Sequence, residues 1–195
     1  MRTAWGYDVS VDSIAPIISV ELFNELTGNK FEDELRAEAA IKAASQAIRN
    51  HCGWHITPAL SCTATPTGGA GVLKLPAGYV STLSGIEENG VAIEAYEWRK
   101  DGLIRRTDCR KWSDKWDGIT VNYTAGYEAE AVPDLVEAVC SIASGVMSVA
   151  PGVVSESADG VAVSYSANAA SIAASLTSQM KSALEPYKLV SSHAV

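Results

Sequence analysis

The chain has 195 residues, of which 47% are hydrophobic and 19% are charged. This balance supplies enough apolar surface for a folded core and excludes an intrinsically disordered chain. A formal net charge of −8 argues against a protein that grips nucleic acid, because such binding depends on clustered Lys and Arg. No signal peptide is apparent and no segment approaches the roughly 18 apolar residues of a membrane span, so we expect synthesis in a cytoplasm and no membrane association.

The first part of the chain is predicted to contain an arm and two helices. Residues 1–18 show no clear hydrophobic period, so we expect an irregular arm. A short helix is predicted over 19–27, because Ser19 can cap its N-terminus and Gly28 can end it. A longer helix is predicted over 32–51, with an acidic first turn and an Ala-rich apolar stripe.

The next region is predicted to form a small antiparallel β-sheet of hairpins inserted between helices. Its hydrophobic period changes to two, and prolines and glycines divide it into short segments. Asn89-Gly90 is a strong two-residue hairpin signal, and Asp101-Gly102 joins a second pair of candidate strands. The predicted strands cover residues 72–75, 80–87, 91–93, 95–98, 103–106 and 118–123.

The last part of the chain is predicted to return to helix. Pro133 suits the first helical position, and apolar residues recur at helical spacing up to Met147. A further hairpin is predicted around Asp159-Gly160, and residues 166–175 fit either a loop or a helix. A final helix is predicted over 175–185.

These elements predict an α+β fold, with a helical core of about four helices and an inserted small antiparallel β-sheet of hairpins. The predicted boundaries are 1–18 for the arm, 19–189 for one domain, 19–56 and 131–189 for its helical core, 57–130 for the β insertion and 190–195 for a tail.

The best candidates for metal ligands are Cys52, His55 and Cys62. A zinc site needs about four ligands in tetrahedral geometry. The fourth ligand here would have to be His51, Cys109 or an acid, and none has a recognisable spacing. Buried cysteines and a histidine near a helix end explain the pattern more simply, so we expect free thiols and no metal.

No catalytic or cofactor-binding arrangement is predicted. The sequence lacks a Gly-x-Ser-x-Gly motif, and its three histidines lie near a helix end and in the tail. Gly68-Gly69-Ala70-Gly71 runs into a strand, whereas phosphate-binding glycine loops open a helix, so we expect a hairpin connection there. We therefore expect a protein that is not an enzyme and holds no cofactor.

Two groups of charged residues are expected to be exposed to solvent. Glu87 and Glu88 adjoin the Asn89-Gly90 turn, which is typical of a solvated hairpin end. A basic group interrupted by Asp108 is typical of a solvated strand edge. It comprises Arg105, Arg106, Arg110 and Lys111.

Three tryptophans, Trp98, Trp112 and Trp116, have two interpretations. They either cover the apolar face of the sheet or anchor a partner, since exposed tryptophans often do so.

The last predicted helix carries a narrow apolar stripe that also has two interpretations. Leu176, Met180 and Leu184 recur every four residues, and Tyr187 continues their face. The stripe either packs on the Ala-rich helices or docks on a partner.

Several short motifs occur in an order typical of one known family. Residues 43–56 (AASQAIRNHCGWHI) are similar to the pattern A-S-x-x-I-x-x-x-C-G-W-x-I. Residues 119–127 (ITVNYTAGY) and 132–135 are similar to V-x-Y-T-x-G-Y … P-x-D-L, although Pro133 and Asp134 are adjacent here. The order is completed by Leu73-Lys74-Leu75-Pro76, by the hairpin residues Tyr96, Trp98 and Leu103, by the segment from Ser155-Glu156-Ser157 to Val163-Ser164-Tyr165-Ser166, and by Leu184-x-x-Tyr187. Over 19–189 the chain thus resembles the head–tail connector (adaptor, or head-completion) family of siphophages.

The resemblance implies a structural virion protein, made in the cytoplasm of a bacterial host. It implies a ring, roughly twelvefold, beneath the portal at the head–tail junction, with no catalytic residues. The implied partners are the phage portal protein, neighbouring copies of the chain, and a stopper or tail-completion protein. Genomic DNA would pass through the ring without tight binding. The residues expected at interfaces are Leu176, Met180, Leu184, Tyr187, Trp98 and Trp112.

Two other functions fit the same sequence. A stopper or tail-completion ring would occupy the same junction, although the helix–sheet–helix order favours the adaptor. A carbohydrate- or protein-binding module would instead use the tryptophan-bearing sheet. Loss of glycan or partner binding after Trp98→Ala would favour such a module.

Overall fold

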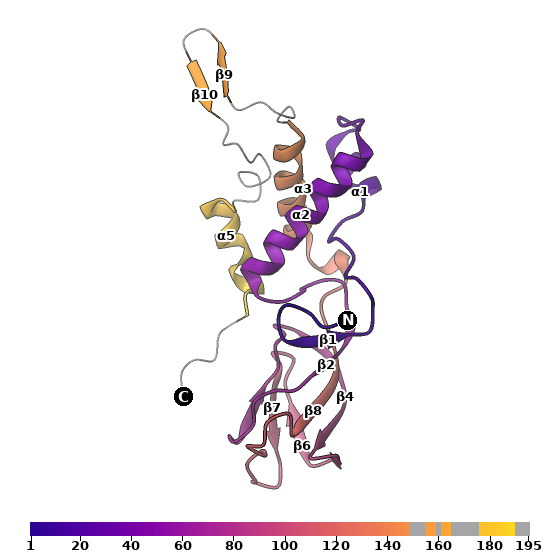
Figure 1. Ribbon diagram of the computed structural model, residues 1–195, viewed down its shortest axis with the longest axis vertical. Coiled ribbons are helices and arrows are strands. Elements are labelled where there is room, and N and C mark those ends of the chain that lie inside the picture. Colours follow the sequence, from indigo (N-terminus) through magenta and orange to yellow (C-terminus); the bar gives the residue numbers. More distant parts are fainter. Residues whose placement is uncertain (149–154, 159–160, 165–175, 190–195) are drawn as a thin grey trace. The chain divides into compact units, whose positions relative to one another are not determined.

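The computed structural model describes residues 1–148, 155–158, 161–164 and 176–189. The chain divides into two compact units. The helical unit comprises Pro16–His51 and Ala129–Pro186, and the β unit comprises Met1–Ala15, Cys52–Glu128 and Tyr187–Val195. The helices of the first unit and the antiparallel sheets of the second (Figure 1) confirm the predicted α+β class.

Helix α1 (Val20–Thr27) has the predicted caps. The Ser19 hydroxyl accepts a hydrogen bond from the Leu22 N–H at 3.2 Å. Gly28 ends the helix with φ of 66°, a left-handed conformation that favours glycine. Phe23 is fully buried, whereas Leu26 is 56% exposed, so only part of the apolar face of α1 enters the core.

Helices α2 (Glu34–Cys52) and α3 (Pro133–Ser148) supply most of the core of the helical unit. The Arg36 guanidinium donates to the Val146 carbonyl at 3.0 Å, which joins α2 to the last turn of α3. A cation at that helix end also offsets the helix dipole. Small and branched side chains are buried at helical spacing: Ala37, Ala40, Ile41, Ala44 and Ile48 on α2, and Leu135, Val139, Ile142, Ala143 and Met147 on α3.

The other elements that the structure describes outside the two sheets are short. They are η1 (Ala129–Ala131), α5 (Ser178–Leu184), η2 (Glu185–Tyr187), and the antiparallel hairpin of β9 (Ser155–Ala158) with β10 (Val161–Ser164). The hairpin confirms the prediction around Asp159-Gly160. The segment predicted as loop or helix, 166–175, and the tail 190–195 lie outside the described residues.

The larger sheet of the β unit has five antiparallel strands in the order β1–β2–β8–β4–β5 (Figure 1). These are β1 (Tyr7–Val9), β2 (Leu60–Ala64), β8 (Ile119–Ala125), β4 (Val80–Glu88) and β5 (Val91–Ile93). Alternate residues of β8 are buried, as expected for a central strand with one face on the core. The turn between β4 and β5 has φ of 53° at Asn89 and 78° at Gly90, so both residues adopt the left-handed conformation of the predicted hairpin.

The β insertion forms two sheets, whereas the sequence predicted one. The second sheet has the order β3–β7–β6, from β3 (Val72–Lys74), β7 (Leu103–Arg106) and β6 (Tyr96–Trp98). Leu73 of β3 lies opposite Ile104 of β7, and both side chains are fully buried. A period of two identifies strands but does not specify which distant strand each one pairs with, so the prediction of one sheet was wrong.

The N-terminal arm is not irregular throughout. Within it, β1 pairs antiparallel with β2, with Tyr7 opposite Ala64. Tyr7 and Val9 are buried on either side of the exposed Asp8, and the Met1 ammonium donates to the Val9 carbonyl at 2.7 Å. This corrects the expectation for residues 1–18. An alternation over only three residues is too short to stand out in a sequence.

Candidate interaction surfaces

The end of the first motif, residues 52–56, and the motif over 119–127 meet inside the β unit. The Tyr127 N–H donates to the Ile56 carbonyl at 2.7 Å, and the rings of Tyr127 and Trp54 lie 6.1 Å apart. Gly126 has φ of +110°, and a Cβ there would lie 2.5 Å from the Pro58 carbonyl oxygen. Only glycine fits this position. The two motifs therefore reflect a packing requirement of the fold.

His55, a candidate metal ligand, is buried with a partner at each ring nitrogen. Its Nε2 lies 3.0 Å from the Ala125 carbonyl, which can only accept, so Nε2 carries the hydrogen. Its Nδ1 lies 2.6 Å from the Tyr7 hydroxyl, which donates to it. The same hydroxyl accepts from the His55 backbone N–H at 3.1 Å. A neutral imidazole satisfies these contacts and uses both nitrogens within the fold.

Two of the four cysteines, Cys62 and Cys140, are poor nucleophiles and poor metal ligands, because their thiols resist ionisation. Burial raises the pKa of the Cys62 thiol to about 11, and burial also raises the pKa of Cys140. Both residues are therefore thiols at neutral pH. Among the described residues, no three His, Cys, Asp or Glu side chains are grouped to hold a metal ion.

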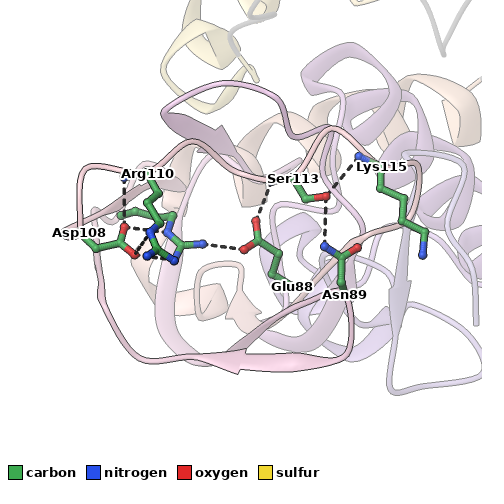
Figure 2. Close-up of polar contacts among 7 residues, drawn as sticks. Glu88, Asn89, Asp108, Arg110, Ser113 and Lys115 are labelled. Carbon is green, nitrogen blue, oxygen red and sulfur yellow. Dashed lines mark hydrogen bonds and ion pairs between the residues drawn. The ribbon is translucent and has the colours of Figure 1, made fainter.

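An ionic cluster surrounds the buried Arg106 of β7, and its other members Glu88, Asp108 and Ser113 are labelled in Figure 2. The Arg106 cluster comprises Arg106, Glu88, Asp108 and Ser113. Arg106 donates to one Glu88 oxygen at 2.6 Å and to both Asp108 oxygens at 2.8 and 2.6 Å, a bidentate pair. Hydrogen bonds from Arg106 are the main cause that lowers the pKa of Asp108 to about 2, and those from Asp108 are the main cause that raises the pKa of Arg106.

This cluster corrects the expectation that both charged groups are solvated. Arg106 is only 8% exposed, because strand alternation places it on the same face of β7 as the buried Ile104. The Glu88 carboxylate is largely covered as well, with its side chain 16% exposed. The other members of the two groups are exposed as predicted: Glu87 is largely exposed, as are Arg105, Arg110 and Lys111.

The loop after β7, residues 107–118 (the Trp116 loop), is anchored through Ser113. The Ser113 N–H donates to Glu88 at 2.6 Å. The Ser113 hydroxyl accepts from the Asn89 side chain at 3.2 Å and from the Lys115 N–H at 3.3 Å (Figure 2). The loop is therefore tied to both the end of β4 and the β4–β5 turn.

The same loop is anchored a second time through Trp112. The Trp112 N–H donates to the Ala70 carbonyl, and the Trp112 carbonyl accepts from the Gly69 N–H, both at 3.0 Å. A Cβ on Gly68 would lie 1.8 Å from the Ser113 carbonyl oxygen, so glycine is required for this approach. The glycine-rich segment, predicted as a hairpin connection, thus lies along the Trp116 loop.

The three tryptophans occupy three different environments. Trp112 is 2% exposed beneath the Arg106 guanidinium, which lies 5.3 Å from its ring centroid. It therefore belongs to the core of the β unit, not to the interface where we expected it. Trp98 is partly exposed and lines a hollow of about 320 Å³ on the smaller sheet. Trp116, which was not among the expected interface residues, is 93% exposed.

The four residues of the predicted C-terminal stripe also lie in different environments. Leu184 is fully buried in the helical unit, where α5 contacts α3. In the β unit, the Tyr187 ring lies 5.9 Å from that of Tyr127, and its carbonyl accepts from the Trp54 indole N–H at 2.7 Å. Leu184 and Tyr187 thus pack within their own chain, which corrects the docking role expected for Leu184. The partly exposed Leu176 and Met180 stay predicted contact residues.

A groove on the helical unit was not expected from the sequence. This α1–α3 groove has a volume of about 550 Å³. Its lining is Leu22, Leu26, Ala129, Glu130, Pro133, Val136, Glu137 and Cys140. The sequence did predict an apolar face on α1, which lines part of this groove. It did not show that Phe23 alone on that face would be fully buried.

The helices that the structure describes include none long and apolar enough to cross a membrane.

A comparison with solved structures relates this fold to a known one. No protein-family model and no curated protein matches the sequence. Among solved structures, the chain is similar to a chain in the neck of an empty GTA (gene transfer agent) particle, computed with C6 symmetry. The alignment covers 94% of this chain and 95% of that chain, with a TM-score of 0.61 and 16% sequence identity. At this identity the similarity establishes a shared fold.

Proposed function

We propose that this protein is a structural, non-catalytic virion component of the head–tail junction of a phage-like particle. The observation that carries this proposal is the similarity in fold to a neck chain of a GTA particle, which extends over 94% of one chain and 95% of the other.

Within that junction, we propose a ring of copies that binds beneath the portal as an adaptor and surrounds the DNA channel. The order of the family motifs supports the adaptor position. The C6 symmetry of the neck in the similar structure is compatible with rings whose copy number is a multiple of six, including the roughly twelvefold ring expected above. The net charge of −8 suits a channel that does not hold DNA tightly.

The non-catalytic part of the proposal is supported by how the chain uses its reactive groups. The buried imidazole of His55 is bonded on both sides, and Cys62 is held as a thiol. The most perturbed charged groups, Arg106 and Asp108, bind each other. Strongly perturbed groups often mark active sites, but structural ion pairs perturb pKa values equally.

Assembly with portal tests this proposal. Purified protein is mixed with the cognate portal, and the product is sized by mass photometry and imaged by electron microscopy. We expect a discrete complex in which a ring of copies is bound to one face of the portal. Failure to form any multi-subunit complex over a wide concentration range would contradict the adaptor role, and binding only to a preformed portal–adaptor complex would indicate a stopper instead.

The hollow beside Trp98 favours a second candidate, the carbohydrate- or protein-binding module. Trp98 lines that hollow with Glu97, Arg99 and Arg105, a mixture of aromatic and polar groups that suits a small polar ligand. Glycan-array binding that is lost in Trp98→Ala, without any effect on ring assembly, would support this candidate.

A further inference from the structure

We propose that the larger sheet continues from one copy to the next, through antiparallel pairing of residues 1–3 of one copy with β5 of its neighbour. This inference rests on the ring proposed above and names a contact that joins its subunits. The two partners are the opposite edges of the same sheet, since residues 1–3 lie against β1 and β5 is the last strand on the other side.

The N-terminal edge presents the backbone of Arg2 outward. Two backbone hydrogen bonds of 2.8 Å join residues 1–3 to β1, from the Thr3 N–H to the Tyr7 carbonyl and from the Val9 N–H to the Met1 carbonyl. Between these bonds Arg2 lies opposite Asp8 as a non-hydrogen-bonded pair. The N–H and C=O of Arg2 therefore point away from β1, and among the described strands none lies beyond them.

Strand β5 presents the backbone of Ala92 outward in the same way. The two-residue turn makes Glu88 and Val91 the first hydrogen-bonded pair of the β4–β5 hairpin. On the β8 side, the Asn89 N–H donates to the Gly118 carbonyl at 2.6 Å, which fits this alternation. Because the bonded pairs alternate along the strand, the N–H and C=O of Ala92 point away from β4.

Strand β5 is an apolar edge without the charges or proline that often protect edge strands. Its sequence is Val-Ala-Ile, and both Val91 and Ala92 are exposed. Strand β4 has two register shifts over residues 80–85, the part that β5 does not cover. Such irregularities discourage further pairing, whereas an exposed apolar edge favours it. The available pairing site on this side of the sheet is therefore β5.

One antiparallel register satisfies both edges. With Arg2 opposite Ala92, their outward N–H and C=O groups exchange two hydrogen bonds. Met1 then lies opposite Ile93, and Val91 lies on the same face as this pair. Met1 is 47% exposed and Val91 is 64% exposed within a single copy. The same register therefore covers two exposed apolar side chains.

The register also brings opposite charges together on the solvent face of the sheet. Arg2 would lie two strands from Glu87, about 10 Å between backbones, with only an alanine side chain between them. A long arginine and a glutamate can span that distance, and neither appears in an ion pair among the described residues. Counting Asp8 and the terminal ammonium, residues 1–9 have a net charge of +1. Residues 86–94 have three acids and no basic residue, and one of these acids is bound in the Arg106 cluster.

Pairing between opposite edges of one sheet produces a head-to-tail assembly. Each added copy leaves one free N-terminal edge and one free β5 at the two ends. A head-to-tail contact of suitable rotation closes into a cyclic oligomer. Both edges belong to the β unit, so the contact does not depend on how the two units of one copy are arranged.

A proline in β5 tests the backbone pairing in the portal-bound ring. Ala92→Pro is expected to keep the melting temperature, because an edge strand accepts proline where its N–H faces solvent. It removes the outward N–H, so ring assembly is expected to weaken by about tenfold or more. Ala92→Ser keeps this N–H and is the matched control, expected to assemble like wild type.

Charge reversal tests the register independently of the backbone. Arg2→Glu and Glu87→Arg are each expected to weaken assembly, and the double variant is expected to recover it. Glu128→Arg makes the same charge change at an exposed position outside both edges and should assemble normally. A double variant that assembles no better than either single variant would contradict the register.

Cross-linking identifies which strand each β5 meets. Ala4→Cys and Ala92→Cys are made in separate chains, each with Cys109→Ser to remove an exposed native thiol. A 4–92 product must then join two copies. We expect a short bismaleimide to give this product in portal-bound rings assembled from the mixed chains. Products that join 92 to 92 instead would indicate two-fold pairing through β5 and would overturn the proposal.

The outcomes separate this contact from the ring itself. If wild-type protein forms rings on the portal while Ala92→Pro assembles equally well and no 4–92 product appears, the contact is wrong and the ring stands. If wild-type protein forms no multi-subunit complex, both proposals fail.

Discussion

Arg106 places a positive charge inside the β unit, and two carboxylates accompany it. Its side chain is 7% exposed, and it contacts Glu88 and Asp108 at 2.6 Å each. Removing a charge from water is costly unless partners compensate it, and losing one partner leaves that cost uncompensated. The cluster therefore responds to any change that neutralises a carboxylate, including acid.

The pH dependence of stability is expected to change in Asp108→Asn. The pKa of Asp108 falls from 3.8 to about 2 on folding, so its ionised form stabilises the folded state. That contribution is present above about pH 4 and is lost as the pH falls through about 2. We expect wild-type protein to lose stability over this interval and Asp108→Asn to lose less, while being less stable than wild type at neutral pH. Urea unfolding followed by circular dichroism at a series of pH values measures both.

Asp117→Asn is the matched control. Asp117 is exposed and has φ of 52°, a conformation that asparagine also adopts readily. Its substitution removes a carboxylate outside the Arg106 cluster, so it should not reproduce the changed pH dependence expected of Asp108→Asn. A wild-type slope in Asp108→Asn would contradict the assignment.

At the level of single residues, some features of the candidate surfaces could be predicted from the sequence and others could not. The positive φ at Asn89 and Gly90 follows from local turn chemistry, and the structure has it. Burial of Arg106 depends on strands and loops that cover β7, and the exposure of Trp116 depends on where Trp112 and Ser113 are held. The charge and hydropathy of one residue do not show which distant segments will cover it or leave it exposed.

At the scale of elements, the Trp116 loop and the glycine-rich segment 68–71 form one structure. Gly68→Ala is expected to separate them, because the new Cβ would lie 1.8 Å from the Ser113 carbonyl oxygen. We expect a loss of about 1–3 kcal/mol of unfolding free energy, typical of overpacking. Faster hydrogen exchange is expected at the Gly69 and Trp112 amides, which bond across the two segments. Thermal unfolding and exchange mass spectrometry measure these effects.

Gly71→Ala provides the control, since a Cβ there has nothing within 4 Å. It should change neither stability nor exchange by a comparable amount. Equal effects in the two variants would mean that close approach at Gly68 does not fix the loop.

Elements with local signals were predicted well. Ser19 and Gly28 cap α1, Pro133 opens α3, and both predicted hairpin turns of the β unit occur. Strands β1 and β2 and the division into two sheets were missed because they depend on pairing between distant segments. The α1–α3 groove was missed for the same reason: Leu22 and Leu26 lie on an apolar face, and only tertiary packing determines which part of that face stays open.

For the whole molecule, the net charge of −8 predicts weak binding to duplex DNA. Too few basic residues are available to displace counterions from phosphates. We expect a dissociation constant above about 1 μM at about 150 mM salt, measured by fluorescence anisotropy. Binding at submicromolar concentration under these conditions would contradict both this prediction and the proposed passive channel, and a titration to lower salt provides the internal control.

The central position of β8 has a consequence for the order in which the chain folds during synthesis. Strand β8 (Ile119–Ala125) joins β2 to β4, so the two halves of the larger sheet have no connecting strand until residue 125 has left the ribosome. Helices α1 and α2 can pack against α3 only later in synthesis, because α3 begins at Pro133. Contacts between such distant segments require closure of long loops and form slowly. A nascent chain stalled before Ile119 should therefore expose Ile41, Ile48 and Val80 to chaperones, whereas one stalled after α3 should not.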